Sequence, residues 1–178
     1  MRRTALAIFA LVALTAATAL AQKTTQLHPG KGGSPHVRSE WTIDGATLTV
    51  EYGRPSLKGR PEAQLMAPGK PWRTGADEAT TLKTDKALKI GNLTVPAGTY
   101  TLYTVPNTGE WELGISKRTG QWGTPVQVND DLGRVKMTVG KTASPVEQLT
   151  IAVDDTAAGG TLRIEWGTTS ATVPFTVG

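Results

Sequence analysis

Strict alternation of apolar and polar residues is the feature that most constrains how this chain can fold. Successive side chains of a β-strand point to opposite faces, so alternation is typical of strands with one buried face. The pattern recurs in the segments 47–52, 99–105, 110–116, 134–140, 148–153, 161–166 and 171–177. After residue 21 no segment keeps the 3.6-residue period of a helix, and residues 61–66 allow one helical turn at most. The sequence therefore predicts an all-β fold.

The segments between these runs carry turn signals. Asp44-Gly45 precedes one alternating run, and Asn107-Thr108-Gly109 separates two others, as expected for tight hairpins. Many short strands joined in this way favour a single antiparallel β-sandwich or jelly-roll-like domain. A chain of 178 residues is long enough to bury a substantial core. One long segment, from Gly53 to Asp77, does not alternate, and we expect it to be an ordered loop.

Residues 1–21 have the pattern of a secretory signal peptide. Arg2 and Arg3 give a positive start, an apolar run covers residues 5–14, and Ala19-Leu20-Ala21 fits a small-residue cleavage site. We therefore expect an exported protein, periplasmic or secreted, that is cleaved near Ala21. The apolar run is too short for a transmembrane helix, so we expect no membrane span.

The next stretch, residues 22–36, is rich in Gly, Pro, Thr and Lys, and we expect it to be a flexible lead-in to a domain over residues 37–178. It contains the only two histidines of the chain, His28 and His36. Metal ligands usually come from a rigid frame with ordered neighbours, which a flexible lead-in does not offer. The chain also has no cysteine. The sequence analysis therefore assigns no metal site, no cofactor and no disulfide.

The net charge gives little indication of a large charged partner. It is +4 for the whole chain and falls to +2 once Arg2 and Arg3 are removed. No long run of like charges is present, so we expect no nucleic-acid partner. The sequence does not indicate an oligomeric state.

The long loop concentrates residues that suit a small ligand. Arginine binds carboxylate, phosphate or sulfate through two parallel hydrogen bonds, and aromatic rings stack on sugars. Arg54, Lys58, Arg60 and Trp72 are therefore our candidate ligand-binding residues. The ligand expected from them is a small anion, a carbohydrate or a component of the cell envelope.

The end of the loop suggests a structural clamp. Arg73 is followed four and five residues later by Asp77 and Glu78, so an ion pair with either acid would hold the loop closed. Asp77 and Glu78 are neighbours in sequence, and on an extended strand they would point to opposite faces.

Three functions remain open from the residues alone. The first is a non-catalytic binding protein with a pocket lined by Arg54, Arg60 and Trp72. The second is a hydrolase of envelope or extracellular carbohydrate, which would need two carboxyl groups facing each other about 5–9.5 Å apart, for example Glu78 with Glu51 or Glu112. The third is a structural or interaction protein that uses exposed strand edges and has no small-molecule site. No residue is assigned a catalytic role.

Several short motifs also resemble a known family. They are Arg54-Pro55-Ser56, Lys58-Gly59-Arg60, the run from Trp72 to Ala76, Glu78-Ala79-Thr80, and the hairpin "VPAGTYTLYTVP" followed by Trp111. Together they resemble the DUF2911 family of small exported bacterial proteins, from about Ser34 to the C-terminus. The resemblance implies a β-sandwich domain and an exported location, and it implies no particular activity. Asp77 stands where members of that family commonly have Asn.

Overall fold

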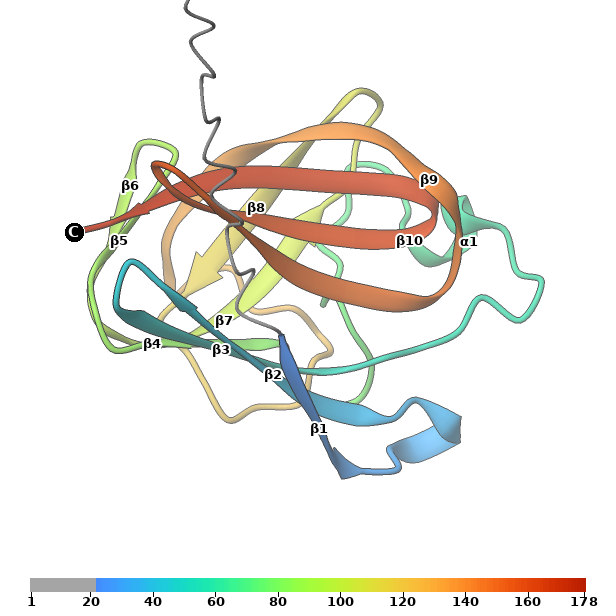
Figure 1. The fold of residues 1–178 in the computed structure, drawn as a ribbon. Helices are drawn as coiled ribbons and strands as arrows, with labels where there is room; N and C mark the ends of the chain where they lie inside the picture. Colours follow the sequence, from blue (N-terminus) through green and yellow to red (C-terminus); the bar gives the residue numbers. More distant parts are fainter. Residues whose placement is uncertain (1–21) are drawn as a thin grey trace, which may run out of the picture.

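The structure, a computed structural model, describes residues 22–178, so the signal peptide predicted for residues 1–21 lies outside the described residues. The described chain is all-β, and its ten strands are antiparallel to their neighbours in one sheet (Figure 1). The order across the sheet is β1-β2-β3-β4-β7-β8-β9-β10-β5-β6. The predicted all-β, antiparallel class is confirmed, whereas the sandwich or jelly-roll arrangement stays a prediction.

The elements have the following bounds. The strands are β1 (Lys23–His28), β2 (His36–Ile43), β3 (Ala46–Gly53), β4 (Thr81–Thr84), β5 (Leu88–Ile90), β6 (Leu93–Val95), β7 (Gly98–Val105), β8 (Glu110–Ser116), β9 (Asp131–Thr156) and β10 (Gly159–Val177). Two short helical turns accompany them, η1 (Lys31–Gly33) and α1 (Glu62–Leu65). The turn α1 lies within the segment 61–66, where the sequence allowed a single helical turn.

The core is formed by the residues that the alternation selects. Val50 of β3, Leu113 of β8 and Ile151 of β9 are completely inaccessible to solvent, and they belong to one continuous apolar cluster. Strand β2 also approaches β9 and β10, although neither is its neighbour in the sheet. The sheet therefore curls around its own apolar face, which excludes water from that face.

Strands β9 and β10 are longer than the sequence predicts. The alternating segments 134–140 and 148–153 lie on one continuous strand, and 161–166 and 171–177 lie on the next (Figure 1). The pairing of β10 with β9 shifts register on both sides of Gly167, which has a φ of +63°. Such irregularities let a strand bend without ending, so an interruption of the alternation is not a strand boundary here.

Strand β1 differs from the sequence-based expectation of a flexible lead-in. Residues 23–28 pair with β2, with Lys23 opposite Glu40 and His28 opposite His36. All six residues of β1 are exposed, since it is an edge strand with no buried face. A strand that buries no side chain needs no apolar residues, and this explains why alternation did not reveal it.

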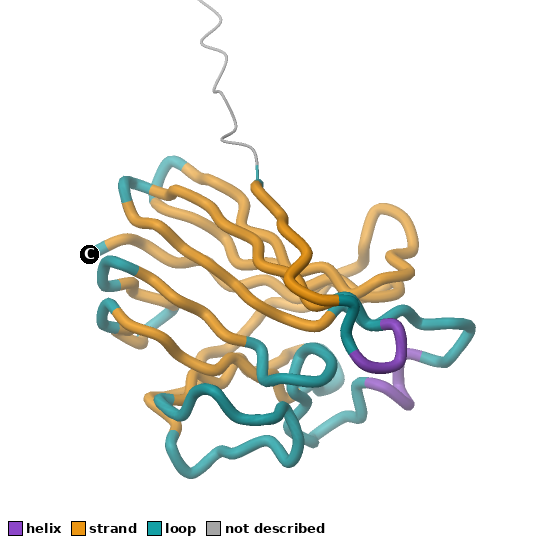
Figure 2. The backbone as a smooth tube through the Cα atoms, turned by 90° about the horizontal axis from the view of Figure 1, so that it is seen from below, coloured by secondary structure: helices purple, strands orange, loops and turns teal. Residues whose placement is uncertain are grey.

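The longer connections gather at one end of the strands. Figure 2 shows tight turns at the opposite end. The hairpin between β2 and β3 turns at Asp44 and Gly45, whose φ values are both positive, as such a turn requires. The segment between β3 and β4 is ordered by the sheet. The backbones of Trp72 and Thr104 exchange two hydrogen bonds of 2.7 and 2.9 Å, and Met66 is buried in the core. Within residues 22–178 no helix is long and apolar enough to cross a membrane.

Candidate functional site

A large open cleft lies where the β3–β4 connection meets the loops of other strands. Its volume is about 780 Å³, and its walls come from η1, α1, the connection itself, the loop before β9 and one residue of β10, Trp166. Three of the four predicted binding residues, Lys58, Arg60 and Trp72, line it. The structure thus places the charged part of the loop beside a cavity wide enough for a small molecule.

Positive charge dominates this cleft. Lys31, Lys58, Arg60 and Arg73 line it, and Asp77 is the one carboxylate among the lining residues. None of these four cations forms an ion pair within the described part of the chain. Uncompensated cations around a concave surface attract anions and raise their local concentration.

The arginine side chains of the cleft are held by backbone carbonyls. Arg60 donates to the carbonyl oxygens of Leu57 and Ser56 at 2.9 and 2.6 Å. Arg73 donates to those of Gly75 and Asp77 at 3.1 and 3.3 Å. A guanidinium group has five N–H donors, so each arginine keeps further donors for a ligand.

The ion pair predicted between Arg73 and Asp77 or Glu78 is therefore not present in the described residues. Arg73 spans the turn from Gly75 to Asp77, but it binds main-chain oxygens, and no ion pair of Arg73 with the carboxylate of Asp77 or Glu78 occurs among residues 22–178. The carboxylate of Asp77 instead accepts a 2.7 Å hydrogen bond from the Lys31 backbone amide.

Arg54 is not part of the cleft lining. Its guanidinium donates to the Leu149 carbonyl and the Thr150 hydroxyl of β9, both at 3.0 Å. The side chain thus joins the start of the loop to the sheet.

The tryptophans of the cleft are stacked on each other. The ring of Trp72 lies parallel to that of Trp166, with centroids 5.7 Å apart, and nearly perpendicular to that of Trp111, with centroids 6.4 Å apart. Trp111 and Trp166 are buried, at 5% and 3% exposure. Because one face of Trp72 is covered by Trp166, it is less available for stacking on a sugar.

Asp77 and Glu78 face different sites, although Asp77 has a φ of +62° and so is not part of an extended strand. Asp77 lines the large cleft, whereas Glu78 lines a second cleft of about 390 Å³ on the β1–β2 side. Glu78 is fixed there by a bridge between its backbone and that of Trp122. This short segment therefore divides two neighbouring sites.

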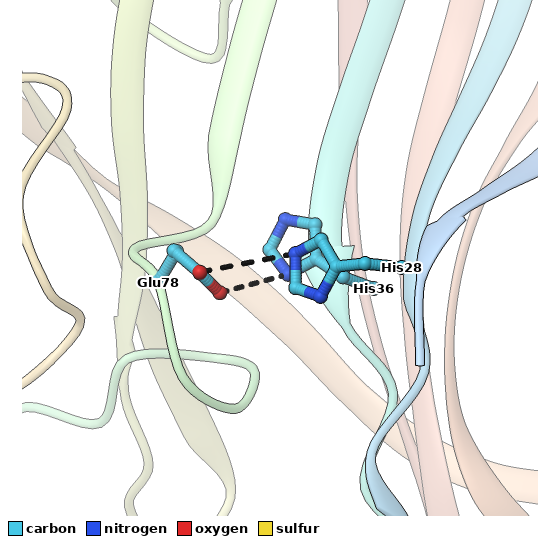
Figure 3. Close-up of side chains that lie close together, drawn as sticks. All are labelled: His28, His36 and Glu78. Carbon is cyan, nitrogen blue, oxygen red and sulfur yellow. Dashed lines mark ion pairs between the residues drawn. The ribbon is translucent and has the colours of Figure 1, made fainter. Parts of the chain in front are cut away.

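The second cleft contains a cluster of two imidazoles and one carboxylate (Figure 3). His28 Nε2 lies 3.8 Å from Glu78 Oε1, and His36 Nδ1 lies 3.3 Å from Glu78 Oε2. The two rings are stacked, with centroids 4.8 Å apart and planes 10° from parallel. One nitrogen or oxygen of each residue lies within 4.8 Å of the others, so these three residues are able to hold a metal ion.

The electrostatics of this cluster are set by the burial of His36. The His36 side chain is 6% exposed, while those of His28 and Glu78 are 44% and 46% exposed. Burial lowers the pKa of His36 below its usual value, and the opposing effect of Glu78 does not outweigh it. At neutral pH His36 is therefore neutral, and a lone pair remains on one ring nitrogen.

Sequence reasoning named Glu78 as a partner of Arg73 and as an example of a hydrolase carboxylate, and it gave the histidines no role. The pairing of β1 with β2 brings His28 beside His36, and Glu78 comes from a segment 42 residues beyond His36. The one signal in the sequence for this cluster was that the only two histidines of the chain lie eight residues apart.

The family resemblance seen in the motifs is confirmed. The family described as "Protein of unknown function (DUF2911)" matches residues 34–175. The chain belongs to the DUF2911 family. Comparisons with curated proteins and with solved structures found no match. The matched region includes the cleft residues of the β3–β4 connection, together with His36 and Glu78, and it begins after His28.

Proposed function

We propose that this DUF2911 protein is an exported binding protein that takes a small anionic ligand in the large cleft. Export rests on the signal-peptide pattern of residues 1–21. Binding rests on one observation, the presence of four cations and a single carboxylate around a cleft of about 780 Å³.

The chemistry of the cleft favours an anion over a neutral sugar. Lys58 and Arg60 are exposed, and the Lys58 side chain forms no hydrogen bond or ion pair within residues 22–178, so its ammonium group is free for a ligand. Arg60 and Arg73 offer planar donor groups suited to carboxylate, phosphate or sulfate oxygens. Trp72, the residue that would stack on a sugar, packs on Trp166 instead.

The hydrolase alternative lacks a supporting arrangement in this cleft. Asp77 is the one carboxylate among its lining residues, whereas glycoside hydrolysis uses two. Glu51 lines the smaller cleft together with Glu78, but Arg38 holds Glu51 in an ion pair of 2.6 Å. We therefore assign no reaction to the protein.

The proposal is tested by calorimetric titration of the purified protein with phosphate, sulfate and citrate, with glucose as the neutral comparison, at constant ionic strength. We expect at least one of the three anions to bind saturably in a 1:1 ratio and glucose not to bind. Lys58→Gln should weaken binding of that anion about tenfold, since it removes one charge-assisted hydrogen bond. Lys70→Gln is the matched control, because Lys70 lies in the same loop but outside the cleft lining.

Two results would contradict the proposal. One is the absence of saturable binding for all three anions. The other is an equal loss of affinity in the Lys58→Gln and Lys70→Gln variants, which would show that overall charge, rather than the cleft, controls binding.

A further inference from the structure

We propose that His28, His36 and Glu78 form a binding site for a divalent transition-metal ion. The site would supply two imidazole nitrogens and one carboxylate oxygen from β1, β2 and the segment before β4. This inference is independent of the anion cleft, because none of the three residues lines that cleft.

The separations within the cluster suit a shared ion. Two ligand atoms that each lie about 2.1 Å from a tetrahedral zinc ion are about 3.4 Å from one another. His36 Nδ1 and Glu78 Oε2 are 3.3 Å apart, and His28 Nε2 and Glu78 Oε1 are 3.8 Å apart. The His28 side chain is 44% exposed, so its ring has room to move toward the other two ligands.

Two atoms of the cluster are buried without a hydrogen-bond partner. They are His36 Nδ1 and Glu78 Oε2, which face each other but lack hydrogen-bond geometry. A buried polar atom left unpaired costs about 1–3 kcal/mol, so such atoms usually have an unseen partner. A metal ion between them would satisfy both atoms.

The backbone around the site provides a rigid frame. His28 and His36 are paired residues of neighbouring strands, and His36 is also paired with Gly53 of β3. The segment that carries Glu78 is anchored by the backbone bridge to Trp122. Ligands from three fixed segments lose little conformational freedom on binding a metal, which favours affinity.

Coordination by His28 requires one local rearrangement. The Gly30 amide donates a 3.2 Å hydrogen bond to His28 Nδ1, so the ring proton lies on Nε2 when His28 is neutral. Binding of a metal through Nε2 moves that proton to Nδ1 and releases the Gly30 amide. Gly30 lies in the partly exposed loop after β1, where water can accept the released amide hydrogen bond.

The donor set indicates the class of ion. Imidazole nitrogens suit zinc, copper, nickel and iron, whereas magnesium and calcium prefer oxygen ligands throughout. Three protein ligands leave at least one coordination position for water or a small molecule. That position would open into the cleft that Leu27 and Trp122 line, the two exposed large hydrophobic residues of the described chain.

The first experiment measures metal binding by the protein without an affinity tag, because a histidine tag would bind the same ions. After treatment with a chelator, the protein is titrated with Zn²⁺ by calorimetry, and Mg²⁺ serves as the comparison ion. We expect one Zn²⁺ per chain and no Mg²⁺ binding. Since the chain has only two histidines, NMR spectra of the imidazole nitrogens should contain two sets of signals, and Zn²⁺ should shift both.

The variants separate loss of the site from loss of the fold. Glu78→Gln and His28→Gln replace exposed or half-exposed side chains with neutral ones of similar size, and each should weaken Zn²⁺ binding by about 10–100-fold or more. Glu40→Gln is the control, because it removes an exposed carboxylate from the same strand as His36 and should leave affinity unchanged. Thermal melts in chelator show whether each variant is folded.

The proposal is overturned if Zn²⁺ binds only weakly at several places, or if folded Glu78→Gln binds it as tightly as the unaltered protein. It is also overturned if only one set of histidine signals shifts. Loss of phosphate, sulfate or citrate binding would not affect it, because that result concerns the separate cleft.

Discussion

The two candidate sites lie on either side of one short segment, yet they are built in different ways. Most of the cleft comes from one stretch of sequence, in which Lys58, Arg60, Trp72 and Arg73 lie within 16 residues. The histidine–glutamate cluster comes from three segments that only the sheet brings together. Local clustering of charge revealed the first site, and no local pattern pointed to the second. A site of few residues from distant segments is therefore the kind that sequence reasoning misses.

The largest effect is expected where the two sites share their support. A Cβ atom added to Gly53 would lie 2.3 Å from the Ala76 carbonyl oxygen. Because both atoms are fixed to the backbone, no side-chain rotation can relieve this clash. Gly53→Ala should therefore lower the free energy of unfolding by about 3 kcal/mol through forced backbone movement. It should also weaken both anion and Zn²⁺ binding, because Ala76 directly precedes Asp77 and Glu78. Urea denaturation and the two titrations test this.

Gly140→Ala is the control for that substitution. A Cβ at Gly140 would meet no atom within 4 Å, so stability should stay within about 0.5 kcal/mol. If Gly53→Ala weakens only one of the two ligands, the sites do not depend on a common support, and that part of the comparison is wrong.

A smaller effect is expected inside the cleft, from a matched pair of arginines. Arg73 and Arg60 each donate two hydrogen bonds to backbone carbonyls, but Arg73 is half-buried and Arg60 is exposed. Arg73→Ala should lower the free energy of unfolding by about 1–3 kcal/mol, because the carbonyls it leaves are shielded from water. Arg60→Ala should change it by less than about 0.5 kcal/mol. Thermal or urea melts of both variants show whether burial of the arginine controls the loss of stability. A larger loss in Arg60→Ala than in Arg73→Ala would assign the clamp to Arg60.

The smallest effect is expected at α1, where Glu62 links this helical turn to β10. Its carboxylate accepts hydrogen bonds from the Thr168 amide at 2.7 Å and from the Thr169 hydroxyl at 2.6 Å. Burial would raise the pKa of Glu62, but these hydrogen bonds outweigh it and hold the pKa below its usual value. The ionised form therefore stabilises the fold at neutral pH. Glu62→Gln should lower the free energy of unfolding by about 1 kcal/mol at pH 7.

The pH dependence of the stability lost in Glu62→Gln follows from the lowered pKa of Glu62. The stabilisation by Glu62 is complete above its ordinary pKa of 4.5 and disappears as the pH falls through the lowered value. Urea melts at pH 7 and at pH 3 should show that the difference in free energy of unfolding between Glu62→Gln and the unaltered protein becomes smaller in acid. Zn²⁺ affinity at pH 7 should not change, since Glu62 lies outside the histidine–glutamate cluster. A loss of Zn²⁺ binding in this variant would show that the two sites are more closely coupled than the structure indicates.

The sequence by itself determined the class of the fold and most of its strands. Alternation works at residues such as Val50, Leu113 and Ile151 because burial of one strand face requires an apolar residue at every second position. The same requirement explains the two places where the structure differs from the sequence-based prediction. The edge strand β1 buries no face and so leaves no pattern, and the bends in β9 and β10 interrupt the pattern without ending the strand.

The candidate site residues differ in the same way. The sequence placed Lys58, Arg60 and Trp72 in one group, and the structure places all three at one cleft, because neighbours in sequence remain neighbours in a single loop. Only the tertiary structure decided that Arg54 turns to β9, that Arg73 binds carbonyls, and that His28, His36 and Glu78 meet. These outcomes depend on strand register and on which surface each loop covers. Both are settled by the packing of the whole sheet, because a shift of one residue in register would move every side chain of a strand to its other face.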